Sequence, residues 1–567
     1  MREPALLGKP TEHSQLDTVL ARLRANAASF ARLPIADKIA LAQSMLEGYV
    51  RIAEPSVYAA CAARGIPLGT RVEGEEWFTG PCAVIRFLRL NAEALRQIDR
   101  DGTTRVGAVG STVDGREKVQ IAPLSTLDGM LFPGITAEVH LEAGAKAGER
   151  APFYRKPDHD GRVALILGAG NMDSLSPMDV ATKMFNEGKV CVLKVSPVNA
   201  HMGPYLEEAF GDPIRRGYLA VVYGGPSEGE YLCKHPAVDE IHITGSDKTH
   251  DQIVWGPAGP ERAERMARNR PLLDKPITSE LGNVSPVLIV PGPYSKSDLA
   301  HLAENIAGQV TANASYACNS GKMLITALGW QQRAELLEGV GRVFAGVPAR
   351  RAYYPGSEQR YASLTESRRD LRKFGGSEGA LPWTIVAGLD PSAATDKAWV
   401  TEPFCSILSE TSVGSPSDPA DYLERAVAFT SERLWGTLSA TIFIHPRTAA
   451  DPRVAKALEH AIVNLEYGTV GINLFPWLVA GMGNAPWGAH PGSTLSDIQS
   501  GRGFVHNSQM LAHVEKTVAR APFRAFPKLI YLPSHRTLQT LGRRFTYFQA
   551  SESLYRLPGV IASALLA

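Results

Sequence analysis

Apolar residues recur at helical spacing through the first hundred positions of the chain. Two runs place them at positions i, i+3, i+4 and i+7, which gives a helix one apolar stripe. The stripes are Leu16, Val19, Leu20 and Leu23 in the first run and Ala42, Met45, Leu46 and Tyr49 in the second. This pattern predicts packed amphipathic helices for this part of the chain.

From residue 163 the pattern changes to short runs that are rich in β-branched residues. Stretches of helical character separate these runs, which is typical of βαβ units and of a mostly parallel sheet. The first series is VALILG, VCVLKV, YLAVVYGG and DEIHITG, and a second series, PVLIVPG, MLITA and TIFIHP, follows Glu280. We therefore expect an α/β protein whose two α/β parts meet close to Glu280.

Few positions between residues 112 and 158 favour a helix. The segment EVHLEAGAKAGERAPFYRKP predicts two strands around a turn of Gly, Ala and Lys. Such a ribbon would project from the fold and pack on its own domain or pair with the sheet edge of another subunit.

Length and charge narrow the class of protein. The chain has 567 residues, 44% of them hydrophobic, which is enough for two or three domains with cores of their own. Its 59 basic and 58 acidic residues leave a formal net charge of +1. No field of the whole molecule would therefore attract nucleic acid or an anionic membrane, and we expect no nucleic-acid partner.

The cysteines indicate the compartment. Six cysteines stand at positions 61, 82, 191, 233, 318 and 405 without any CxxC pair, which fits a reducing compartment better than a disulfide or zinc framework. We expect a cytoplasmic protein without a metal site. No segment approaches 18 uninterrupted apolar residues and the N-terminus lacks a signal-like apolar core, so we expect no membrane span and no secretion.

Two residues beside apolar runs carry groups suited to acyl chemistry. Glu280 in TSELGNVSPVLIV offers a carboxylate, and Cys318 in ANASYACNSGKMLIT offers a thiol. A thiolate attacks an aldehyde carbon to give a tetrahedral thiohemiacetal, from which hydride can leave to a nicotinamide. The developing oxyanion needs N–H donors, and Asn171, after VALILG and a Gly-Ala-Gly turn, lies in a loop suited to supply one.

The order of motifs from about residue 15 to 510 resembles that of the aldehyde dehydrogenase superfamily. The matching motifs are GAGN ending at Asn171, VLKVSP with Lys194, HITGS with Gly245 and Ser246, ELG with Glu280, the segment around Cys318, EPF with Glu402 and Phe404, and NAPWGAHPGS leading to SGRG. Each motif alone is weak evidence, whereas their common order and spacing make a chance match improbable.

The resemblance implies three catalytic residues. Cys318 would be the nucleophile, and Asn171 would hold the oxyanion together with the backbone N–H of Cys318. Glu280 would be the general base that activates water to hydrolyse the thioester, a task that benefits from a carboxyl pKa raised by partial burial.

The resemblance also implies a set of cofactor-binding residues. The set comprises Lys194 at the adenosine ribose with Ser196 beside it, Gly245 and Ser246 at a helix N-terminus near the pyrophosphate, Glu402 at the nicotinamide ribose, and Phe404 beside the nicotinamide ring. The cofactor would be NAD or NADP, and the substrate a small-molecule aldehyde.

The chain departs from the superfamily pattern in several places. Ala169 and Gly170 stand where Pro-Trp is common, NSGK follows Cys318 where an Arg-ending version is frequent, and about a dozen extra residues precede Glu280. Pro197 and Val198 stand where many NAD-preferring relatives have a glutamate that binds the ribose hydroxyls. Because a 2′-phosphate would meet no carboxylate there and could pair with Lys194, we favour NADP.

The resemblance implies an α/β fold with a Rossmann-like cofactor domain, a second α/β catalytic domain and a projecting β-hairpin used in oligomerisation. The predicted parts are residues 1–130 and 159–283 for NAD(P) binding, 284–483 for catalysis, and 131–158 and 484–567 for bridging and assembly as a homodimer or homotetramer. The last sixty residues run beyond the superfamily's usual end. We expect this tail to dock on its own or a neighbouring subunit, with a peripheral membrane contact as the alternative.

The expected activity is NAD(P)-dependent oxidation of an aldehyde to a carboxylic acid. Two alternatives stay open: an acyl-thioester reductase or CoA-acylating relative with the same cysteine, and a catalytically silent scaffold. Glu280 argues against the first, because relatives that exclude water commonly lack this base. Retention of thiol, amide and carboxylate argues against the second. Phe475 and Trp477 fit a substrate tunnel or the core equally well.

Overall fold

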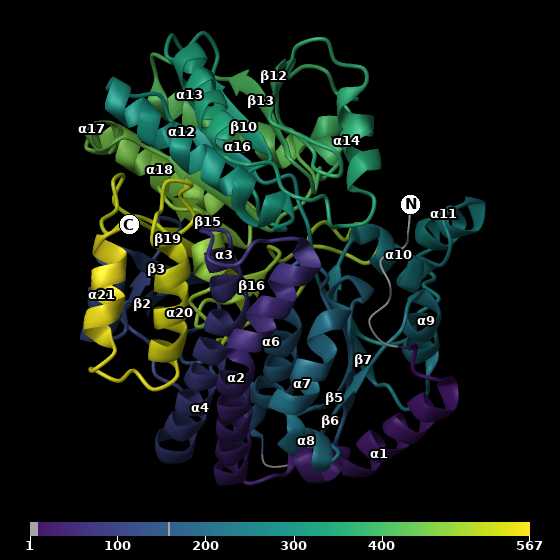
Figure 1. Ribbon diagram of the computed structural model, residues 1–567. Helices are drawn as coiled ribbons and strands as arrows, with labels where there is room; N and C mark the ends of the chain where they lie inside the picture. The colour runs from purple at the N-terminus through teal and green to yellow at the C-terminus, as the bar shows by residue number, and fades with distance from the viewer. Residues whose placement is uncertain (1–8, 157–158) are drawn as a thin grey trace.

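Two large β-sheets organise the protein (Figure 1). The structure, a computed structural model, describes residues 9–156 and 159–567. The predicted domain limits at residues 1 and 158 lie outside the described residues. The prediction of an α/β protein with two sheets is confirmed.

The first sheet has six strands in the order β17-β8-β7-β4-β5-β6. The strands are β4 (Val163–Leu167), β5 (Val190–Lys194), β6 (Leu219–Val222), β7 (Glu240–Gly245), β8 (Ile277–Leu281) and β17 (Gly501–Arg502). All neighbours pair in parallel except β17, which is antiparallel to β8. The chain winds outward from β4 in both directions, so a crevice opens beyond the carboxyl ends of β4 and β7, where such sheets bind ligands.

Helices cover this sheet, as the helical pattern of the first hundred residues predicts. They are α1 (His13–Ala31), α2 (Ile35–Arg64), α4 (Ala83–Asp101), α6 (Leu175–Ala181), α7 (Gly203–Ala209), α9 (Pro226–Lys234) and α10 (Asp247–Trp255). The stripe residues Leu16, Leu20 and Leu23 are buried in one core with the strands β4 and β5. Part of the extra segment before Glu280 forms α11 (Pro260–Ala267), which has no buried residue.

The second sheet has eleven strands in the order β1-β2-β3-β19-β15-β14-β9-β10-β13-β12-β11. Its parallel strands are β9 (Pro286–Ile289), β10 (Met323–Ala327), β12 (Trp383–Leu389), β13 (Ile407–Val413), β14 (Ser439–Phe443), β15 (Thr469–Ile472) and β19 (Val514–Arg520). Strand β11 (Leu371–Phe374) closes one edge. The runs PVLIVPG, MLITA and TIFIHP thus form strands, as expected.

Antiparallel strands β1 (Val109–Ser111), β2 (Glu117–Ala122) and β3 (Thr136–Leu141) extend the second sheet beyond β19. The prediction of two strands around the Gly/Ala/Lys turn is wrong in its second half. Residues 142–156 form no second strand, and within them an isolated bridge joins Arg150 to Leu511. The reason is that both edges of β3 are already occupied, by β2 and by β19. Residues 109–122 pair with this sheet, although the sequence grouped residues up to 130 with the cofactor domain.

The tail after β19 folds back on its own chain. Helix α20 (Leu538–Gln549) packs against α3 (Glu73–Trp77) and against the π-helical segment Phe78–Cys82. Its residues Leu541, Phe545 and Phe548 share a hydrophobic cluster with Cys82. Helix α21 (Leu557–Leu565) follows as the last element. Among the described residues no helix is both long and apolar enough to cross a bilayer.

Candidate active site

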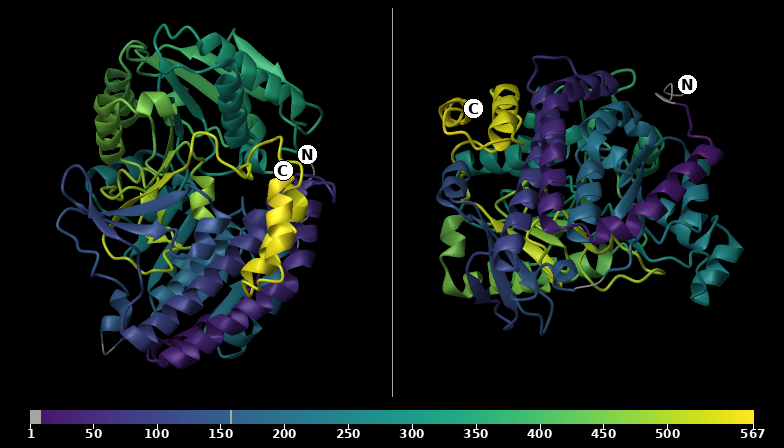
Figure 2. Two further views of the ribbon diagram at one scale, coloured as in Figure 1. Left: turned by 90° about the vertical axis from the view of Figure 1, so that its left-hand side faces the viewer. Right: turned by 90° about the horizontal axis from the view of Figure 1, so that it is seen from below.

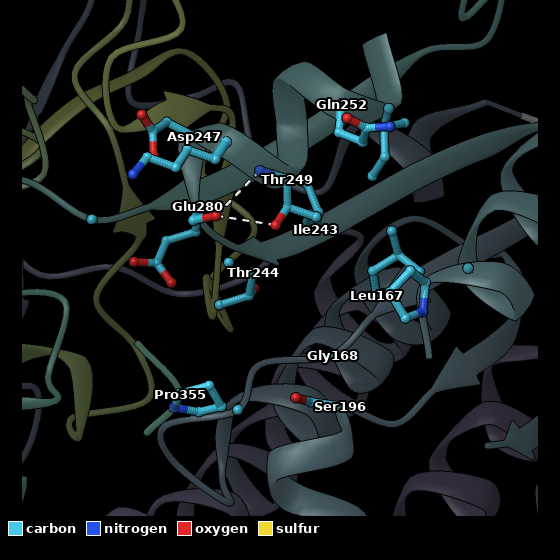
Figure 3. Close-up of a pocket in the computed structure, with 18 of the residues that line it drawn as sticks. Leu167, Gly168, Ser196, Ile243, Thr244, Asp247, Thr249, Gln252, Glu280 and Pro355 are labelled. Atoms are coloured by element: carbon cyan, nitrogen blue, oxygen red, sulfur yellow. Dashed lines mark hydrogen bonds between the residues drawn. The ribbon is translucent and has the colours of Figure 1, made fainter. Parts of the chain in front are cut away.

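A cavity of about 830 Å³ opens at the carboxyl ends of β4, β5 and β7 (Figure 3). All nine residues that the sequence singled out line it: Asn171, Lys194, Ser196, Gly245, Ser246, Glu280, Cys318, Glu402 and Phe404. The first sheet supplies the residues up to 280, and the second part of the chain supplies Cys318, Glu402 and Phe404. The cavity therefore joins both parts of the molecule.

The thiol of Cys318 and the carboxyl group of Glu280 lie beside each other in this cavity. Glu280 belongs to β8 and is 3% exposed. Its Oε1 is buried and lacks a hydrogen-bond partner among the described residues. A buried carboxyl oxygen without a partner is costly to the fold, which makes Glu280 a candidate for a chemical rather than a structural role.

The pKa values of both groups are raised. Burial, followed by the charges of Asp179 and Glu402, raises the pKa of Glu280 from 4.5 to about 8. Burial and the neighbouring Glu280 carboxylate raise the pKa of the Cys318 thiol well above its ordinary value. Because two adjacent anions are disfavoured here, the pair holds at least one proton near neutral pH, which Glu280 and Cys318 are placed to exchange.

A second buried acid lies behind Glu280. Asp179 of α6 accepts a hydrogen bond from Thr244 Oγ1 at 2.9 Å, and its Oδ1 lies 3.0 Å from His506 Nε2. Thr244 and Glu280 are register partners on β7 and β8, so they point to the same side of the sheet. The charge of Asp179 is one cause of the high pKa of Glu280.

Asn171 is fixed by contacts on both its side chain and its backbone. Its Nδ2 donates to the carbonyl oxygen of Tyr316 at 2.9 Å, which leaves its second N–H for another acceptor. The backbone oxygen of Asn171 accepts from Asn313 Nδ2 at 2.9 Å and from the Tyr353 hydroxyl at 3.2 Å. The amide is therefore held rigidly beside the loop that carries Cys318, the candidate nucleophile.

That loop has an unusual backbone. Asn313, Ala314 and Ser315 have φ values of 48°, 52° and 70°, which non-glycine residues seldom adopt, and never in series without support. Glu75 of α3 supplies part of that support, because its Oε2 accepts from the backbone N–H of Asn313 at 3.1 Å. The strained turn ends three residues before Cys318.

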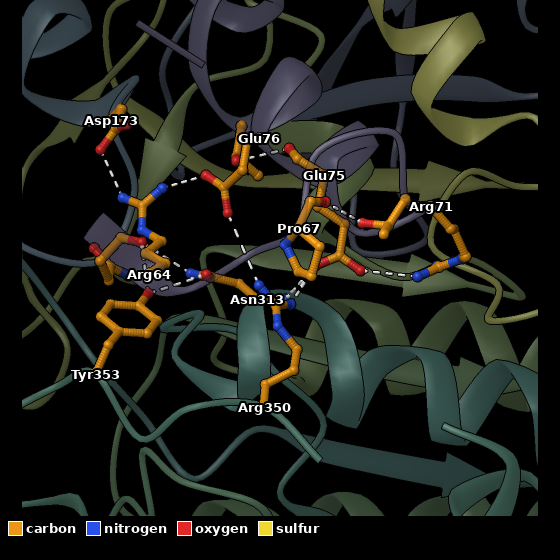
Figure 4. A network of polar contacts seen from close by, with 12 residues as sticks. Arg64, Pro67, Arg71, Glu75, Glu76, Asp173, Asn313, Arg350 and Tyr353 are labelled. Atoms are coloured by element: carbon orange, nitrogen blue, oxygen red, sulfur yellow. Dashed lines mark hydrogen bonds and ion pairs between the residues drawn. The ribbon is translucent and has the colours of Figure 1, made fainter. Parts of the chain in front are cut away.

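A buried ionic network fixes Glu75 in turn (Figure 4). Arg71 Nη1 donates to Glu75 at 3.0 Å and Arg350 Nη1 donates at 2.7 Å. Arg64 pairs with both Glu76 and Asp173, the latter at 2.6 Å, and Arg350 comes within 3.9 Å of Glu76. Since Arg350 belongs to the second part of the chain, the network ties the nucleophile loop to the helices that cover the first sheet.

The opposite end of the cavity has the features of an anion site. Ser246 caps α10 with its hydroxyl, which accepts from the Thr249 N–H at 3.2 Å, and the N-terminus of this helix faces the cavity. Helix N-termini attract phosphate groups through their free N–H groups and dipole. Lys194 ends β5, is 7% exposed and lies along Gly229, and burial lowers its pKa.

Lys322 connects the loop at Cys318 to Glu402. This lysine is 1% exposed, and its Nζ donates to Glu402 Oε1 at 2.6 Å and to the carbonyl oxygens of Ala317 and Cys318 at 3.1 Å each. All three donors of its ammonium group are therefore used. Gly282 allows this arrangement, because an added Cβ would lie 1.8 Å from Glu402 Oε2.

Phe404 lies beside this ion pair. It has a φ of 42°, and Arg360 holds its backbone by donating to the carbonyl oxygens of Pro403 at 3.0 Å and Phe404 at 3.2 Å. Its ring packs edge-on against Tyr354 at 4.8 Å. Burial raises the pKa of Glu402, and the Lys322 charge opposes that rise.

These features fit a dinucleotide. The cavity has the size of a cofactor site, with a capped helix N-terminus and Lys194 at one end and a glutamate with one uncommitted oxygen at the other. Gly245 offers the close backbone approach that a phosphate needs. Lys194 and Ser196 would hold the adenosine end, and Glu402 and Phe404 the nicotinamide end.

Comparisons with known proteins agree with this geometry. The model of the aldehyde dehydrogenase family matches residues 149–335, which include most of the cavity residues. The solved NADP-dependent glyceraldehyde-3-phosphate dehydrogenase of Bacillus halodurans C-125, complexed with NADP, superposes with a TM-score of 0.61 at 17% identity, over 90% of this chain and 91% of that chain. Over residues 149–335 this chain is therefore similar to the aldehyde dehydrogenase family, and over most of its length it shares the fold of solved aldehyde dehydrogenases.

Other similar proteins are also distant in sequence. Aldehyde dehydrogenase C of Pseudomonas syringae, in a complex with NAD+ and octanal, gives a TM-score of 0.60 at 17% identity, over 92% of this chain and 91% of that chain. At such identities a solved structure shows the shared fold alone. Human 4-trimethylaminobutyraldehyde dehydrogenase is 33% identical over 103 residues, which is 18% of each chain. The match thus spans less than a fifth of that relative.

Several residues of this site were not found from the sequence. Lys322 was visible only as a departure in NSGK, and nothing in the sequence pointed to Glu402 as its partner. Arg64, Glu75 and Glu76 lie more than two hundred positions before Cys318 and carry no motif. Phe475 and Trp477 pack in the core with Tyr531 of the tail and do not line the cavity.

Proposed function

We propose that this protein oxidises an aldehyde to a carboxylic acid with NAD or NADP, through a thiohemiacetal and a thioester on Cys318. The observation that carries the proposal is the common cavity of the Cys318 thiol, the Glu280 carboxyl group and the Asn171 amide, continuous with the capped N-terminus of α10. A bound nicotinamide supplies the hydride acceptor.

The first half of the reaction needs a thiolate. Glu280 in its ionised form accepts the proton of the Cys318 thiol, and the sulfur attacks the aldehyde carbon. The carbonyl oxygen becomes an oxyanion, which the free N–H of Asn171 and the backbone N–H of Cys318 stabilise. Rigid contacts from Asn313 and Tyr353 keep that amide in place, so little reorganisation is needed. Loss of hydride from the same carbon leaves a thioester on Cys318.

The second half needs water. Glu280 first passes the proton that it accepted from Cys318 to solvent. The ionised carboxylate then takes a proton from a water molecule, whose oxygen attacks the thioester carbon, and the C–S bond breaks to release the carboxylic acid and the Cys318 thiolate. A carboxyl group with a pKa of about 8 suits this task, since its conjugate base is stronger than an ordinary carboxylate. Hydrogen bonds from Lys322 to the carbonyl oxygens of Ala317 and Cys318 steady the loop that carries the leaving sulfur.

We propose NADP as the preferred cofactor. Pro197, which lines the cavity one residue after Ser196, brings no carboxylate against a 2′-phosphate, and Lys194 lies within the same wall. The Bacillus structure carries NADP and the Pseudomonas structure carries NAD+, so the fold accommodates both. A measured preference for NAD of about a hundredfold, or roughly 2.7 kcal/mol, would contradict this.

The test of the function is an aldehyde panel offered with NAD and NADP, each with and without CoA. The proposal predicts reduced cofactor and free carboxylic acid without CoA. Cofactor reduction only in the presence of CoA would favour the acyl-thioester alternative. No cofactor reduction with any aldehyde would favour the catalytically silent scaffold. The position of Glu280 beside the thiol supports water rather than CoA as the acceptor.

We further propose a homodimer or homotetramer in a reducing compartment. Strand β1 is exposed along its whole length and forms an edge of the eleven-stranded sheet, which favours pairing with another chain. Six free cysteines, five of them buried, support the reducing compartment. Light scattering of the purified protein tests the oligomeric state. The cell fraction from which the protein is extracted tests the compartment.

A further inference from the structure

The outer face of the last helix is apolar and exposed. Around α21 the exposed large side chains are Leu554 (72%), Tyr555 (98%), Ile561 (37%), Leu565 (51%) and Leu566 (71%). Ile561, Leu565, Leu566 and the exposed Ala562 follow helical spacing and form one stripe, and Leu554 and Tyr555 lie in the turn just before the helix. Figures 1 and 2 show α20 and α21 as a helical pair at the periphery of the molecule.

Polar contacts fix this orientation. The inner face of α21 buries Val560 and Ser563 against α20. Arg544 donates to the Gly559 carbonyl oxygen at 3.0 Å and to Ser563 Oγ at 2.8 Å, and the Thr537 hydroxyl donates to the Ser563 carbonyl oxygen at 2.6 Å. These bonds hold α21 with its apolar stripe outward, so the stripe is a feature of the packed helix rather than a misplaced core face.

Basic residues flank the stripe. Arg556 directly precedes α21, and Arg544 of α20 lies against it, donating to Ser563 Oγ. Arg536, just before α20, is exposed. Residues 521–567 contain six lysines and arginines and a single acidic residue, Glu552, whereas the whole chain is nearly neutral. Glu552 is paired with Arg89 at 2.7 Å. Arg524 and Arg543 are likewise paired, with Asp298 and Glu54. The tail therefore carries a net positive charge beside its exposed apolar residues.

This charge decides between occupants of the stripe. If two copies met through this face in a twofold interface, the same arginines would confront each other, which costs free energy. An anionic bilayer surface satisfies both features, because aliphatic side chains enter the acyl boundary while flanking arginines reach the head groups. We propose that α21 and the preceding turn dock this protein on anionic membrane surfaces.

The test uses the full-length protein and flotation with vesicles of phosphatidylcholine alone or with 30% phosphatidylserine added, an anionic fraction of about a third. The wild type should float with the anionic vesicles, less so at high salt. The double variant Ile561→Glu/Leu565→Glu should lose at least about tenfold in partition. A matched control, Leu68→Glu/Leu328→Glu, changes two other exposed leucines and should bind as the wild type does.

Three results would overturn the proposal. One is equal flotation of the wild type and the Ile561→Glu/Leu565→Glu variant, which would mean that the stripe is not used. Another is absence of vesicle binding together with a dimer, seen by light scattering, that the same variant dissociates. The third is binding to heparin and not to vesicles. Thermal unfolding of each variant checks that the substitutions leave the fold intact.

Discussion

Lys322 joins the candidate nucleophile to the candidate ribose-binding carboxylate. Its Nζ lies 2.6 Å from Glu402 Oε1 and 3.1 Å from the carbonyl oxygen of Cys318. The Lys322 side chain is 1% and the Glu402 side chain 17% exposed, so solvent screens the ion pair only in part. One buried cation thus holds the loop at Cys318 and the wall at Glu402 in a fixed relation, and also favours the thiolate of Cys318.

Replacement of Lys322 by Met should disturb both the loop at Cys318 and Glu402. Glu402 would lose the cation that opposes its rise in pKa, and the thiol of Cys318 would become harder to ionise. We expect stability to fall by about 3–5 kcal/mol and alkylation of Cys318 by iodoacetamide to slow and shift to higher pH. Lys248→Met, which removes an exposed lysine from the same cavity, is the control and should leave alkylation unchanged.

Cys318→Ala should abolish hydride transfer altogether, because no other thiol lies in the cavity among those the structure describes except Cys233 at the adenosine end. The control is Cys405→Ala, which removes a buried thiol one residue after Phe404. We expect this variant to keep activity within about threefold. Stopped-flow absorbance of the reduced cofactor measures both. Activity that survives in Cys318→Ala would remove the proposed nucleophile.

Glu280→Gln should separate the two halves of the reaction. Hydrolysis of the thioester loses its base, so steady-state turnover should fall by at least about 100-fold. The burst of reduced cofactor should keep an amplitude near one equivalent, while its rate at pH 7 falls and recovers at higher pH as the thiol ionises unaided. Rapid-mixing kinetics over a pH series test this. A burst without reduction in turnover would show that Glu280 is no base.

The pH dependence of the wild type follows from the same group. The base form of Glu280 is required and its pKa is about 8, so the rate should rise up to that pH and level off above it. At pH 7 only about a tenth of the carboxyl groups are ionised. A rate that is flat between pH 6 and pH 9, a range of roughly one unit or more on each side of that value, would contradict the raised pKa.

The raised pKa also makes a stability prediction. The folded protein binds the Glu280 proton more tightly than the unfolded chain does. The free energy of unfolding therefore falls as the pH rises from 4.5 to about 8, and the full loss remains above that pH. Glu280→Gln removes that loss. The variant should therefore be more stable than the wild type at pH 8 by on the order of 2–4 kcal/mol, and similar to it at pH 4.5. Denaturant melts at both pH values give the comparison.

The ionic network beneath the nucleophile loop gives a fifth prediction. Glu75→Gln weakens the pairs to Arg71 and Arg350 and the bond to the Asn313 N–H. We expect kcat to fall by about tenfold or more with little change in the cofactor KM, since the strained turn shifts Cys318 and Asn171. The control is Glu54→Gln, whose partner Arg543 is exposed. A change in the cofactor KM without a fall in kcat would show that Glu75 does not position Cys318 and Asn171.

The sequence predicted most of what depends on short-range pattern. Runs such as VALILG and VCVLKV became strands because their apolar β-branched residues fill a helix-covered sheet. Lys194, Ser246 and Asn171 fall at the carboxyl ends of parallel strands or directly after them, so their convergence follows from topology.

What could not be predicted depends on contacts between distant segments. The bond from Asn313 to Glu75 links residues 238 positions apart, and no local pattern marks either of them. The second strand expected after residue 142 failed because β19, more than 370 positions later, already occupies the edge of β3. The tail was expected to dock, but its apolar outer face emerges only once α20 has fixed the direction of α21.

The central claim is that Cys318 carries the acyl group during turnover, and mass spectrometry of the quenched enzyme tests it most directly. The protein would be mixed with an aldehyde that the panel identifies and with NADP, stopped in acid within the burst, and digested. We predict an acyl mass on the peptide that contains Cys318, at higher occupancy in Glu280→Gln than in the wild type. Turnover without any adduct on Cys318, or with an adduct on another cysteine, would contradict the account.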